Sequence, residues 1–294
     1  MQEGKISIRG LLIHVSHYDP KWCSNKTSEE PFDVDVAEHV VDAMRAHNMN
    51  LLVVDCADGV RYESHPELAR AYTVPMASLK HLASYAHRHG IDVVPKLNFS
   101  KSGRNQHDQW MVPHVDQISW MSGFDKYWQI ADDVIKELVE ALDPKAFFHI
   151  GMDEDHSRSL VQYVEAIKIL RRLVARHKLR TVIWNDSCYF NNKRAIAQVH
   201  AEKCRAAEEY LPRDIVHVLW DYGQAHPAIV KRLTKQGFAV WGAPGQGPSQ
   251  VRNWRNAIVA NGGNGLLMTR WIKCCKRNEE ELLGLTGRLG SLYT

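Results

Sequence analysis

The segment AFFHIGMDEDH, residues 146–156, joins a short apolar run to two adjacent carboxylates, Asp153 and Glu154. Successive side chains of a β-strand point to opposite faces of the sheet. Two neighbouring acids within a strand would therefore face opposite sides. At the end of a strand the chain leaves the sheet, and this restriction is lifted. We expect residues 146–154 to form a strand that delivers both carboxylates to one edge of a sheet.

Seven other runs of the chain have the same character. Each is short, apolar throughout and often closed by a polar residue, which is typical of strands that are buried on both faces of a parallel sheet. These runs are residues 10–16, 50–56, 91–99, 180–186, 215–223, 238–244 and 265–271.

Segments with helical periodicity separate the predicted strands. Gly90 stands where a helix C-cap is expected, and Asn278 stands where an N-cap is expected. The predicted helices cover residues 33–48, 76–90, 124–143, 159–177, 194–211, 226–237, 249–263 and 278–293.

Eight strand–helix units in 294 residues predict an α/β protein of the (β/α)8 TIM barrel type. We expect a single catalytic domain over residues 1–294, because no linker, internal repeat or low-complexity segment interrupts the alternation. A doubly wound open sheet is the alternative fold. It is disfavoured because the chain has no G-x-G-x-x-G phosphate-binding loop.

Composition excludes several classes of partner. The net charge is +3, from 37 basic and 34 acidic residues, which predicts no nucleic-acid or membrane partner. No apolar run approaches the roughly 18 residues of a membrane span. The N-terminus has no secretory leader, so we expect a cytoplasmic protein or a trimmed chain. The six cysteines form no C-x-x-C pair, so we expect reduced thiols, no metal site and no cofactor. Nothing in the sequence indicates the oligomeric state.

The barrel gives the acidic pair a place. Active sites of this fold lie at the C-terminal ends of the strands, where Asp153 and Glu154 are predicted. His149, Gly151 and Asp153 would share the inward face, and Glu154 would reach over the mouth from the first loop position. We favour a catalytic pair over a solvated acidic loop.

Tryptophans mark the ends of the later predicted strands. Trp184, Trp220, Trp241 and Trp271 would surround one pocket with flat apolar faces and N–H donors. Sugar rings stack on such surfaces, and carboxylates perform acid–base chemistry at a glycosidic bond. The pattern indicates a glycosidase.

The segment FHIGMDE resembles the H-x-G-G-D-E signature of glycoside hydrolase family 20, the β-N-acetylhexosaminidases. The runs RGLLIHVSH, IDVVPKLNF, IWND and VLW are loosely similar to the first, third, fifth and sixth strands of that family. The resemblance spans most of the barrel. The small N-terminal domain common in the family has no counterpart here, which implies a bare catalytic barrel without an accessory domain.

The resemblance implies a retaining, substrate-assisted mechanism on a terminal β-linked 2-acetamido sugar. In the family the acetamido carbonyl of the substrate attacks the anomeric carbon. Glu154 would protonate the leaving oxygen and later activate water, and Asp153 would bind the acetamido N–H. By the same resemblance, Trp184, Trp220 and Trp241 are candidates for the walls around the acetamido group.

The chain departs from the family where sugar hydroxyls are held. His17 replaces an arginine, Lys96 and Asn98 stand in place of the E-x-D-x-P-G-H segment, and Arg270 replaces the glutamate of W-T-E. Tyr222 is the nearest substitute for a tyrosine of the seventh strand. Because Lys and Arg only donate hydrogen bonds, Lys96 and Arg270 would suit a sugar with a negative substituent.

Several alternatives stay open at this point. Lys96 could instead pair with Asp55 or Glu154, and Arg270 with Asp186. A metal site of His14, His17, Asp55 and Asp186 is disfavoured, because H-x-x-H spacing places the histidines on different faces of a strand. The enzyme could be a glycosidase without acetamido assistance, using Glu154 with Asp186 or Asp221, or the barrel could bind sugar without turnover.

The expected substrate-binding residues are His17, Lys96, Asn98, His107, Trp110, Trp184, Asp186, Trp220, Tyr222, Trp241 and Arg270. Among these, His107 and Trp110 belong to the long loop after the third strand.

Overall fold

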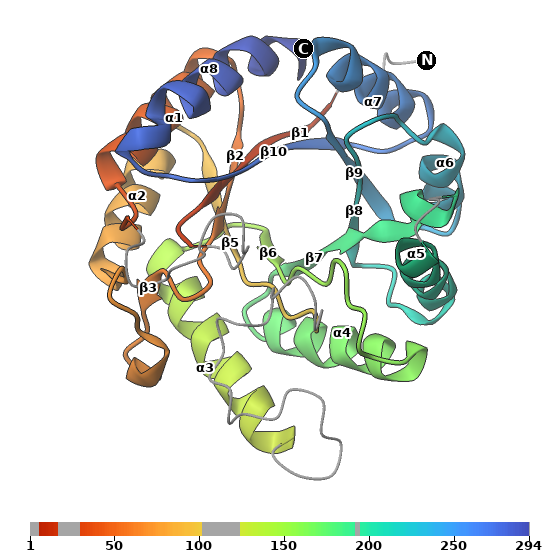
Figure 1. Cartoon of the computed structure of the whole chain (residues 1–294), viewed down its shortest axis with the longest axis horizontal. Helices are drawn as coiled ribbons and strands as arrows, with labels where there is room; N and C mark the ends of the chain where they lie inside the picture. Colours follow the sequence, from red (N-terminus) through yellow and green to blue (C-terminus); the bar gives the residue numbers. More distant parts are fainter. Residues whose placement is uncertain (1–5, 17–29, 102–123, 192–194, 294) are drawn as a thin grey trace.

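The structure is a computed structural model, and it describes residues 6–16, 30–101, 124–191 and 195–293 (Figure 1). His17, His107 and Trp110, three of the expected sugar-binding residues, lie outside these ranges. Within these ranges, the structure describes only the backbone of residues 124, 125, 190, 191 and 195–197.

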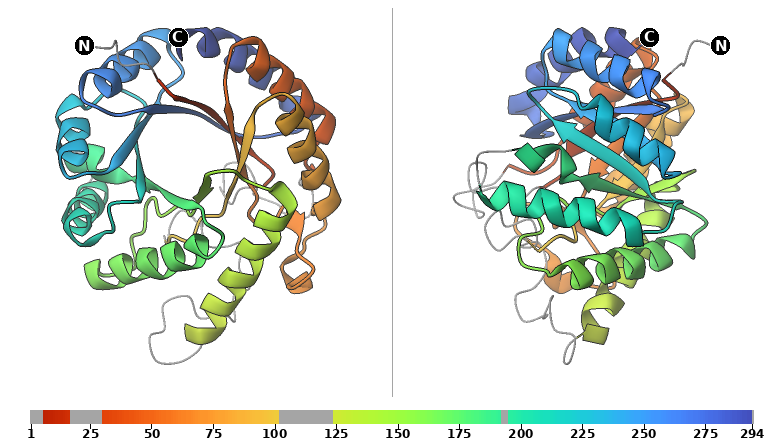
Figure 2. Two further views of the ribbon diagram at one scale, coloured as in Figure 1. Left: turned by 180° about the vertical axis from the view of Figure 1, so that it is seen from behind. Right: turned by 90° about the vertical axis from the view of Figure 1, so that its right-hand side faces the viewer.

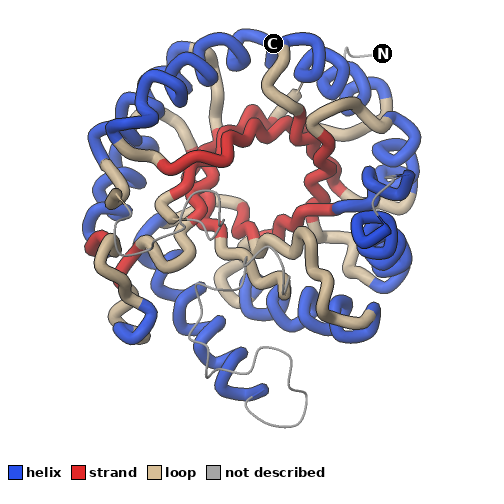
Figure 3. The backbone as a smooth tube through the Cα atoms, in the orientation of Figure 1, coloured by secondary structure: helices blue, strands red, loops and turns tan. Residues whose placement is uncertain are grey.

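Eight parallel strands close into a barrel in the order β1-β10-β9-β8-β7-β6-β5-β2. The helices surround this ring, as Figures 2 and 3 show. The predicted TIM barrel is confirmed. The open sheet is excluded because β1 and β2, the first and last strands of this order, also pair with each other, which closes the ring. The barrel strands are β1 (Ile8–His14), β2 (Leu51–Asp55), β5 (Asp92–Lys96), β6 (Phe147–His149), β7 (Arg180–Asn185), β8 (Val216–Asp221), β9 (Ala239–Pro244) and β10 (Gly265–Lys273).

One helix of the described ranges follows each barrel strand, close to where the sequence predicts it. A small two-stranded sheet and several short 3₁₀ helices extend the connections. The helices are α1 (Val34–Ala46), α2 (Met76–Arg88), α3 (Phe124–Leu142), α4 (Leu160–Ala175), α5 (Ala195–Ala207), α6 (Pro227–Lys235), α7 (Pro248–Ala260) and α8 (Glu279–Gly290). The small sheet pairs β3 (Val60–Arg61) with β4 (Val74–Pro75), and the 3₁₀ helices are η2 (Pro66–Leu68), η3 (Asp186–Asn191), η4 (Glu208–Tyr210), η5 (Lys276–Asn278) and η6 (Ser291–Tyr293).

Polar residues and glycine fix several helix ends. Ser159 and Gln162 form a reciprocal capping box at the start of α4, which satisfies two backbone N–H groups. Gly90 follows the C-cap of α2 with a φ of +73°, a left-handed conformation that favours glycine. Asn278 lies at the N-cap of α8 as expected, but its side chain donates to the Lys273 carbonyl and does not cap the helix.

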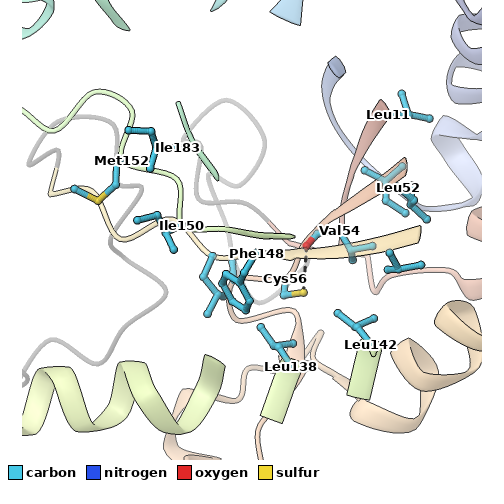
Figure 4. Packing of buried hydrophobic residues seen from close by; sticks show 14 of the residues in the cluster. Leu11, Leu52, Val54, Cys56, Leu138, Leu142, Phe148, Ile150, Met152 and Ile183 are labelled. Atoms are coloured by element: carbon cyan, nitrogen blue, oxygen red, sulfur yellow. Dashed lines mark hydrogen bonds between the residues drawn. The ribbon is translucent and has the colours of Figure 1, made fainter. Parts of the chain in front are cut away.

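Strand side chains alternate between two apolar layers. One layer fills the barrel, and the other packs between the strands and the helices; Figure 4 shows part of the outer layer against Leu138 and Leu142 of α3. The inner layer includes Leu12, Val53, Val94, Phe147, Val182 and Leu267. Two residues further along, the inward positions turn polar or aromatic: His14, Asp55, Lys96, His149, Trp184 and Thr269. The alternation therefore places a layer of different chemistry at the C-terminal end of the barrel.

Two further observations concern the cysteines and the helices of the described residues. The five cysteines among them, Cys56, Cys188, Cys204, Cys274 and Cys275, are all free and buried. Among the described helices, none combines the length and apolar character needed to cross a bilayer.

Candidate active site

A buried ion pair lies next to the C-terminal mouth of the barrel. Lys96 Nζ donates to Asp55 Oδ2 at 2.7 Å, and His14 Nδ1 lies 3.0 Å from the same oxygen. All three side chains are buried. Additional hydrogen bonds of this kind help a buried ion pair to offset its lost hydration. Of the roles considered for Lys96, the pair with Asp55 is confirmed, and its ammonium group lies inside the barrel.

His149 faces the same layer and pairs in register with Lys96. Its Nδ1 accepts a hydrogen bond from the Gly151 amide at 3.0 Å. Burial, together with the charge of Lys96, holds the pKa of this imidazole well below its usual value. The ring is therefore neutral and carries its proton on Nε2. The His149 ring lies 4.7 Å from the ring of Trp184, centroid to centroid, with the two planes tilted.

The chain leaves β6 in a turn with left-handed backbone at three residues. The φ angles are +72° at Gly151, +80° at Met152 and +50° at Glu154. A Cβ at Gly151 would lie 2.2 Å from Asn98 Oδ1, so only glycine fits there. The predicted strand 146–154 is thus too long, because β6 ends at His149. The turn breaks the strand alternation that would otherwise separate the two acids.

Asn98 anchors the first acid of the pair. Its Nδ2 donates to Asp153 Oδ1 at 2.7 Å, and Asp153 is only 5% exposed. The Asn98 Oδ1 atom accepts hydrogen bonds from the amides of Met152, at 3.0 Å, and Ser100, at 3.1 Å. One side chain from the segment after β5 therefore fixes both the turn and the Asp153 carboxylate.

Asp186, the first residue after β7, anchors the second acid. Its Oδ2 accepts the backbone amide of Glu154 at 2.8 Å, and its Oδ1 accepts the indole N–H of Trp220 at 2.7 Å. His200 Nε2 lies 2.9 Å from Oδ2. Burial alone would raise the pKa of Asp186, but the charge of His200 and these hydrogen bonds outweigh it and lower the pKa. The carboxylate is therefore ionised.

Aromatic side chains at the C-terminal end of β8, just after it and on β10 lie beside the acidic pair. The Trp271 indole donates to the Tyr222 hydroxyl at 2.5 Å. The ring of Trp220 lies 5.6 Å from that of Tyr222, and the ring of Trp271 lies 6.4 Å from that of Trp184. Trp220, Tyr222 and Trp271 are partly exposed, whereas Trp184 is buried beneath them.

The acids and this aromatic group are close enough to interact electrostatically. Desolvation raises the pKa of Tyr222 to about 12, and the charges of Asp153 and Glu154 act in the same direction. The phenol is therefore a neutral hydrogen-bond donor at physiological pH. A donor of this kind beside two carboxylates suits a substrate with a carbonyl or hydroxyl oxygen.

Trp241 does not lie where the sequence predicts it. It is the third residue of β9 and is 1% exposed. Its ring contacts Phe147, the first residue of β6, at a centroid distance of 5.0 Å. The expectation of a strand-end position is wrong, because Trp241 fills the barrel interior towards the N-terminal end of β6.

Arg270 also lies away from the mouth. Its Nε donates to Glu281 Oε1 of α8 at 2.6 Å, on the helix side of the barrel. The expectations that it faces the sugar or pairs with Asp186 are wrong. The reason is strand phase: β10 continues to Lys273, and its inward positions near the mouth are Thr269 and Trp271.

Trp271, one of the tryptophans expected at a strand end, faces inward because it shares the face of Leu267 in steps of two along β10. One residue of the site is not marked by its position after a strand. His200 lies on α5, in the middle of a helix, and its contact with Asp186 joins residues 14 positions apart. Nothing in the local sequence marks it. No cluster of three metal-binding side chains occurs among the described residues.

No family model and no curated relative matches the sequence. Several solved structures are similar in fold. A chitobiase of Flavobacterium johnsoniae superposes with a TM-score of 0.67 at 16% identity, over 97% of this chain and 48% of that one. An N-acetyl-β-hexosaminidase of Streptomyces plicatus in complex with Thio-NAglucal gives 0.68 at 16%, over 98% and 63%. A glycoside hydrolase family 20 exo-β-N-acetylglucosaminidase of Vibrio harveyi in complex with N-acetylglucosamine gives 0.64 at 11%, over 98% and 54%.

This chain spans between about half and just under two thirds of the length of these three structures. At such low identities the likeness establishes a shared barrel fold. The chemistry has to be argued from the residues at the mouth.

Proposed function

We propose that the protein is a retaining glycoside hydrolase that removes a terminal β-linked N-acetylhexosamine, or a modified relative, with assistance from the substrate. The observation that carries the proposal is the double anchoring of Asp153 and Glu154. Asn98 holds the side chain of the first acid at 2.7 Å, and Asp186 holds the backbone of the second at 2.8 Å. The similar structures are chitobiase and hexosaminidase barrels, which supports the same substrate class.

In the proposed first step, the acetamido carbonyl oxygen of the substrate attacks the anomeric carbon as the bond to the leaving oxygen breaks. Glu154 gives its proton to that oxygen. Asp153 accepts the acetamido N–H and stabilises the positive charge that develops on the cyclised intermediate. Water then attacks the anomeric carbon, Glu154 takes its proton, and the acetamido group reopens. One acid serves the leaving group and the other the nucleophile, so adjacent positions suit them.

The aromatic side chains supply the binding surface. Trp220 and Trp271 present partly exposed indole rings on which a sugar ring can stack. The Tyr222 hydroxyl accepts from Trp271, which leaves its own proton for the acetamido carbonyl. Trp184 closes the floor beneath. Trp241 has no part in this proposal, because it lies deeper in the barrel.

The decisive experiment compares aryl glycosides with and without a 2-acetamido group. Glu154→Gln should lower kcat by about 10² to 10⁴-fold, the usual effect of losing a positioned general acid, with an unchanged melting temperature. Asp153→Asn should impair 2-acetamido substrates, and a thiazoline mimic of the cyclised intermediate should inhibit the wild type. Glu165→Gln is the matched control, because Glu165 lies on α4 in a partly exposed pair with Lys168.

The other outcomes identify the alternatives. Hydrolysis of ordinary glucosides without thiazoline inhibition would indicate a glycosidase that uses Glu154 with a second carboxylate. Asp186 and Asp221 are then the candidates, and each accepts three hydrogen bonds in the structure. Sugar binding without hydrolysis, unchanged in Glu154→Gln, would indicate a barrel that binds without turnover.

A further inference from the structure

His200 and the Glu154 backbone share one acceptor atom, Asp186 Oδ2. The Glu154 amide lies 2.8 Å from this oxygen and His200 Nε2 lies 2.9 Å from it. The other oxygen, Oδ1, accepts from Trp220 Nε1 at 2.7 Å. Three N–H donors favour the ionised form of this carboxyl group, because protonation turns one of its oxygens into a donor and leaves less capacity to accept.

His200 is built into the interior of the protein. It is 3% exposed and comes from α5. Cys204 Sγ lies 3.5 Å from Nε2, and the ring of Tyr163 stands edge-on at 6.2 Å. Burial lowers the pKa of this imidazole, but Cys204 and Asp186 outweigh that effect and raise it far above its usual value. These interactions favour a protonated His200 beside the Asp186 carboxylate.

A second histidine lies beside this pair without competing for the proton. The rings of His156 and His200 are 5.3 Å apart, centroid to centroid. Burial and the charge of His200 lower the pKa of His156, so the positive charge sits on His200. The other titratable groups around the pair are Glu154 and Asp155 after β6, Tyr163 on α4, Cys188 and Tyr189 on η3, Lys203 and Cys204 on α5, and Asp221 and Tyr222 at the end of β8.

We propose that His200 is a positioning residue, which as the cationic partner of Asp186 keeps that carboxylate an acceptor for the Glu154 amide and so holds the Glu154 side chain in its working place. The hydrogen-bond geometry stands on its own, while the catalytic consequence rests on the proposed function. His200 contacts Asp186 and Cys204, and we infer that it acts on Glu154 through Asp186.

Loss of the His200 cation should raise the pKa of Asp186. An opposite charge within a few ångströms lowers the pKa of a carboxyl group by about 1 to 3 units. Without the His200 cation, Asp186 takes up its proton at higher pH. The hydrogen bond from the Glu154 amide is then weakened over a wider acidic range, and the acid limb of the activity profile moves to higher pH.

The test uses His200→Gln, whose amide N–H can replace Nε2–H without the charge. In the wild type and the variant, kcat is measured against pH on a 2-acetamido aryl glycoside. The indole ¹⁵N–¹H signal of Trp220 is followed in parallel, because this N–H donates to Asp186 and reports its ionisation without any substrate. His81→Gln is the control, since it removes a histidine–carboxylate pair between His81 of α2 and Glu38 of α1.

We expect the acid limb and the Trp220 midpoint to rise together by about 1 to 3 pH units in His200→Gln, with near wild-type kcat above the limb and no shift in His81→Gln. An equal loss of kcat at every pH with an unmoved Trp220 midpoint would overturn the proposal. If the variant does not fold, the imidazole ¹⁵N signals of the wild type decide instead: a neutral His200 at pH 7 overturns the proposal, and a cation supports it. If the wild type cleaves no glycoside, the proposed function fails, and the Trp220 titration still decides the link between His200 and Asp186.

Discussion

Asn98 donates a hydrogen bond to the Asp153 carboxylate at 2.7 Å and, through its own carbonyl oxygen, accepts the Met152 amide at 3.0 Å. One short side chain thus couples the conformation of the turn to the orientation of an acid. Gly151 belongs to the same arrangement, because any Cβ there would collide with Asn98 Oδ1. The acid pair is therefore held in place both by the turn that follows β6 and by Asn98, which follows β5.

Asn98→Asp tests this coupling. The change removes the donor to Asp153 and places a like charge beside it, so one of the two carboxyl groups must take up a proton. Hydrogen bonds to charged groups contribute about 1.5 to 3 kcal/mol, so kcat/KM on 2-acetamido substrates should fall by roughly 10 to 100-fold. The control is Asn50→Asp, at the N-terminal end of the barrel, where the side chain also bonds backbone groups. Equal losses in both variants would contradict a specific role of Asn98.

Met152 carries a backbone conformation that glycine would adopt more easily. Its φ is +80° and its side chain is fully buried, at the position of the second glycine in the H-x-G-G-D-E pattern. Met152→Ala and Met152→Gly both lose the buried side chain, at about 2 to 5 kcal/mol. Alanine keeps a Cβ, which in the left-handed region costs roughly 1 to 2 kcal/mol. Met152→Gly should therefore be at least as stable as Met152→Ala in urea unfolding.

Met44 provides the comparison for that pair of variants. It is also fully buried but lies in the helix α1, where glycine is less favourable than alanine by about 1 kcal/mol. Met44→Gly should thus unfold more easily than Met44→Ala. The same order at Met152 would show that the turn is not strained there.

The barrel could be predicted from the sequence because each element carries its own local signal. Strands buried on both faces read as apolar runs, and the helices between them show a period of 3.6 residues. Boundaries were less certain where the chemistry of the site interrupts the pattern. The apolar residues Ile150 and Met152 extend the run of β6, yet the chain turns away after His149 because Gly151 and Met152 take left-handed angles.

The site could be predicted where function follows from position after a strand, and not where it depends on strand phase or on distant partners. Asp153 and Glu154 lie at the predicted rim. Arg270 and Trp271 are neighbours in the chain, and a shift of one residue in the phase of β10 exchanges which of them faces the barrel. His200 reaches Asp186 only through the packing of α5 against η3.

Lys96→Met should destabilise the protein strongly. The variant leaves the Asp55 carboxylate buried without its ammonium partner, and breaking a buried pair on one side costs about 3 to 5 kcal/mol. The double variant Lys96→Met with Asp55→Asn removes both charges and should recover part of that loss. Urea unfolding of the two single variants and the double variant measures the coupling. If the losses in unfolding free energy of the two single variants simply add in the double variant, the 2.7 Å contact between Lys96 and Asp55 contributes no coupling energy.

The lowered pKa of the buried His217 side chain predicts that the protein loses stability towards acidic pH. Its Nδ1 accepts the Asn185 side-chain amide at 2.9 Å, and burial, followed by Arg213 and Arg232, lowers its pKa to about 3. An unfolded histidine binds a proton below about pH 6.5, whereas the folded one does not until about pH 3. The free energy of unfolding therefore falls as pH decreases through this window.

His217→Asn keeps an acceptor for Asn185 but cannot take up a proton. The slope of the unfolding free energy between about pH 5 and 6.5 should be shallower than in the wild type. Some slope should remain, because the pKa of His149 is lowered in the same direction. Indistinguishable slopes would show that His217 does not contribute to the acid sensitivity.

Arg270→Met decides whether a base at the end of β10 selects charged sugars. In the structure the guanidinium binds Glu281 of α8, and both side chains are partly exposed. Pairs of this kind contribute about 0 to 1 kcal/mol, so the variant should change kcat/KM by less than roughly fivefold. The factor should be the same for neutral, sulfated and uronic 2-acetamido substrates, because Arg270 faces away from the mouth. Glu281→Gln breaks the same pair from the other side and should have a matching small effect on stability. A wild-type preference for charged sugars that collapses in Arg270→Met but persists in Glu281→Gln would show that Arg270 turns inward to the substrate.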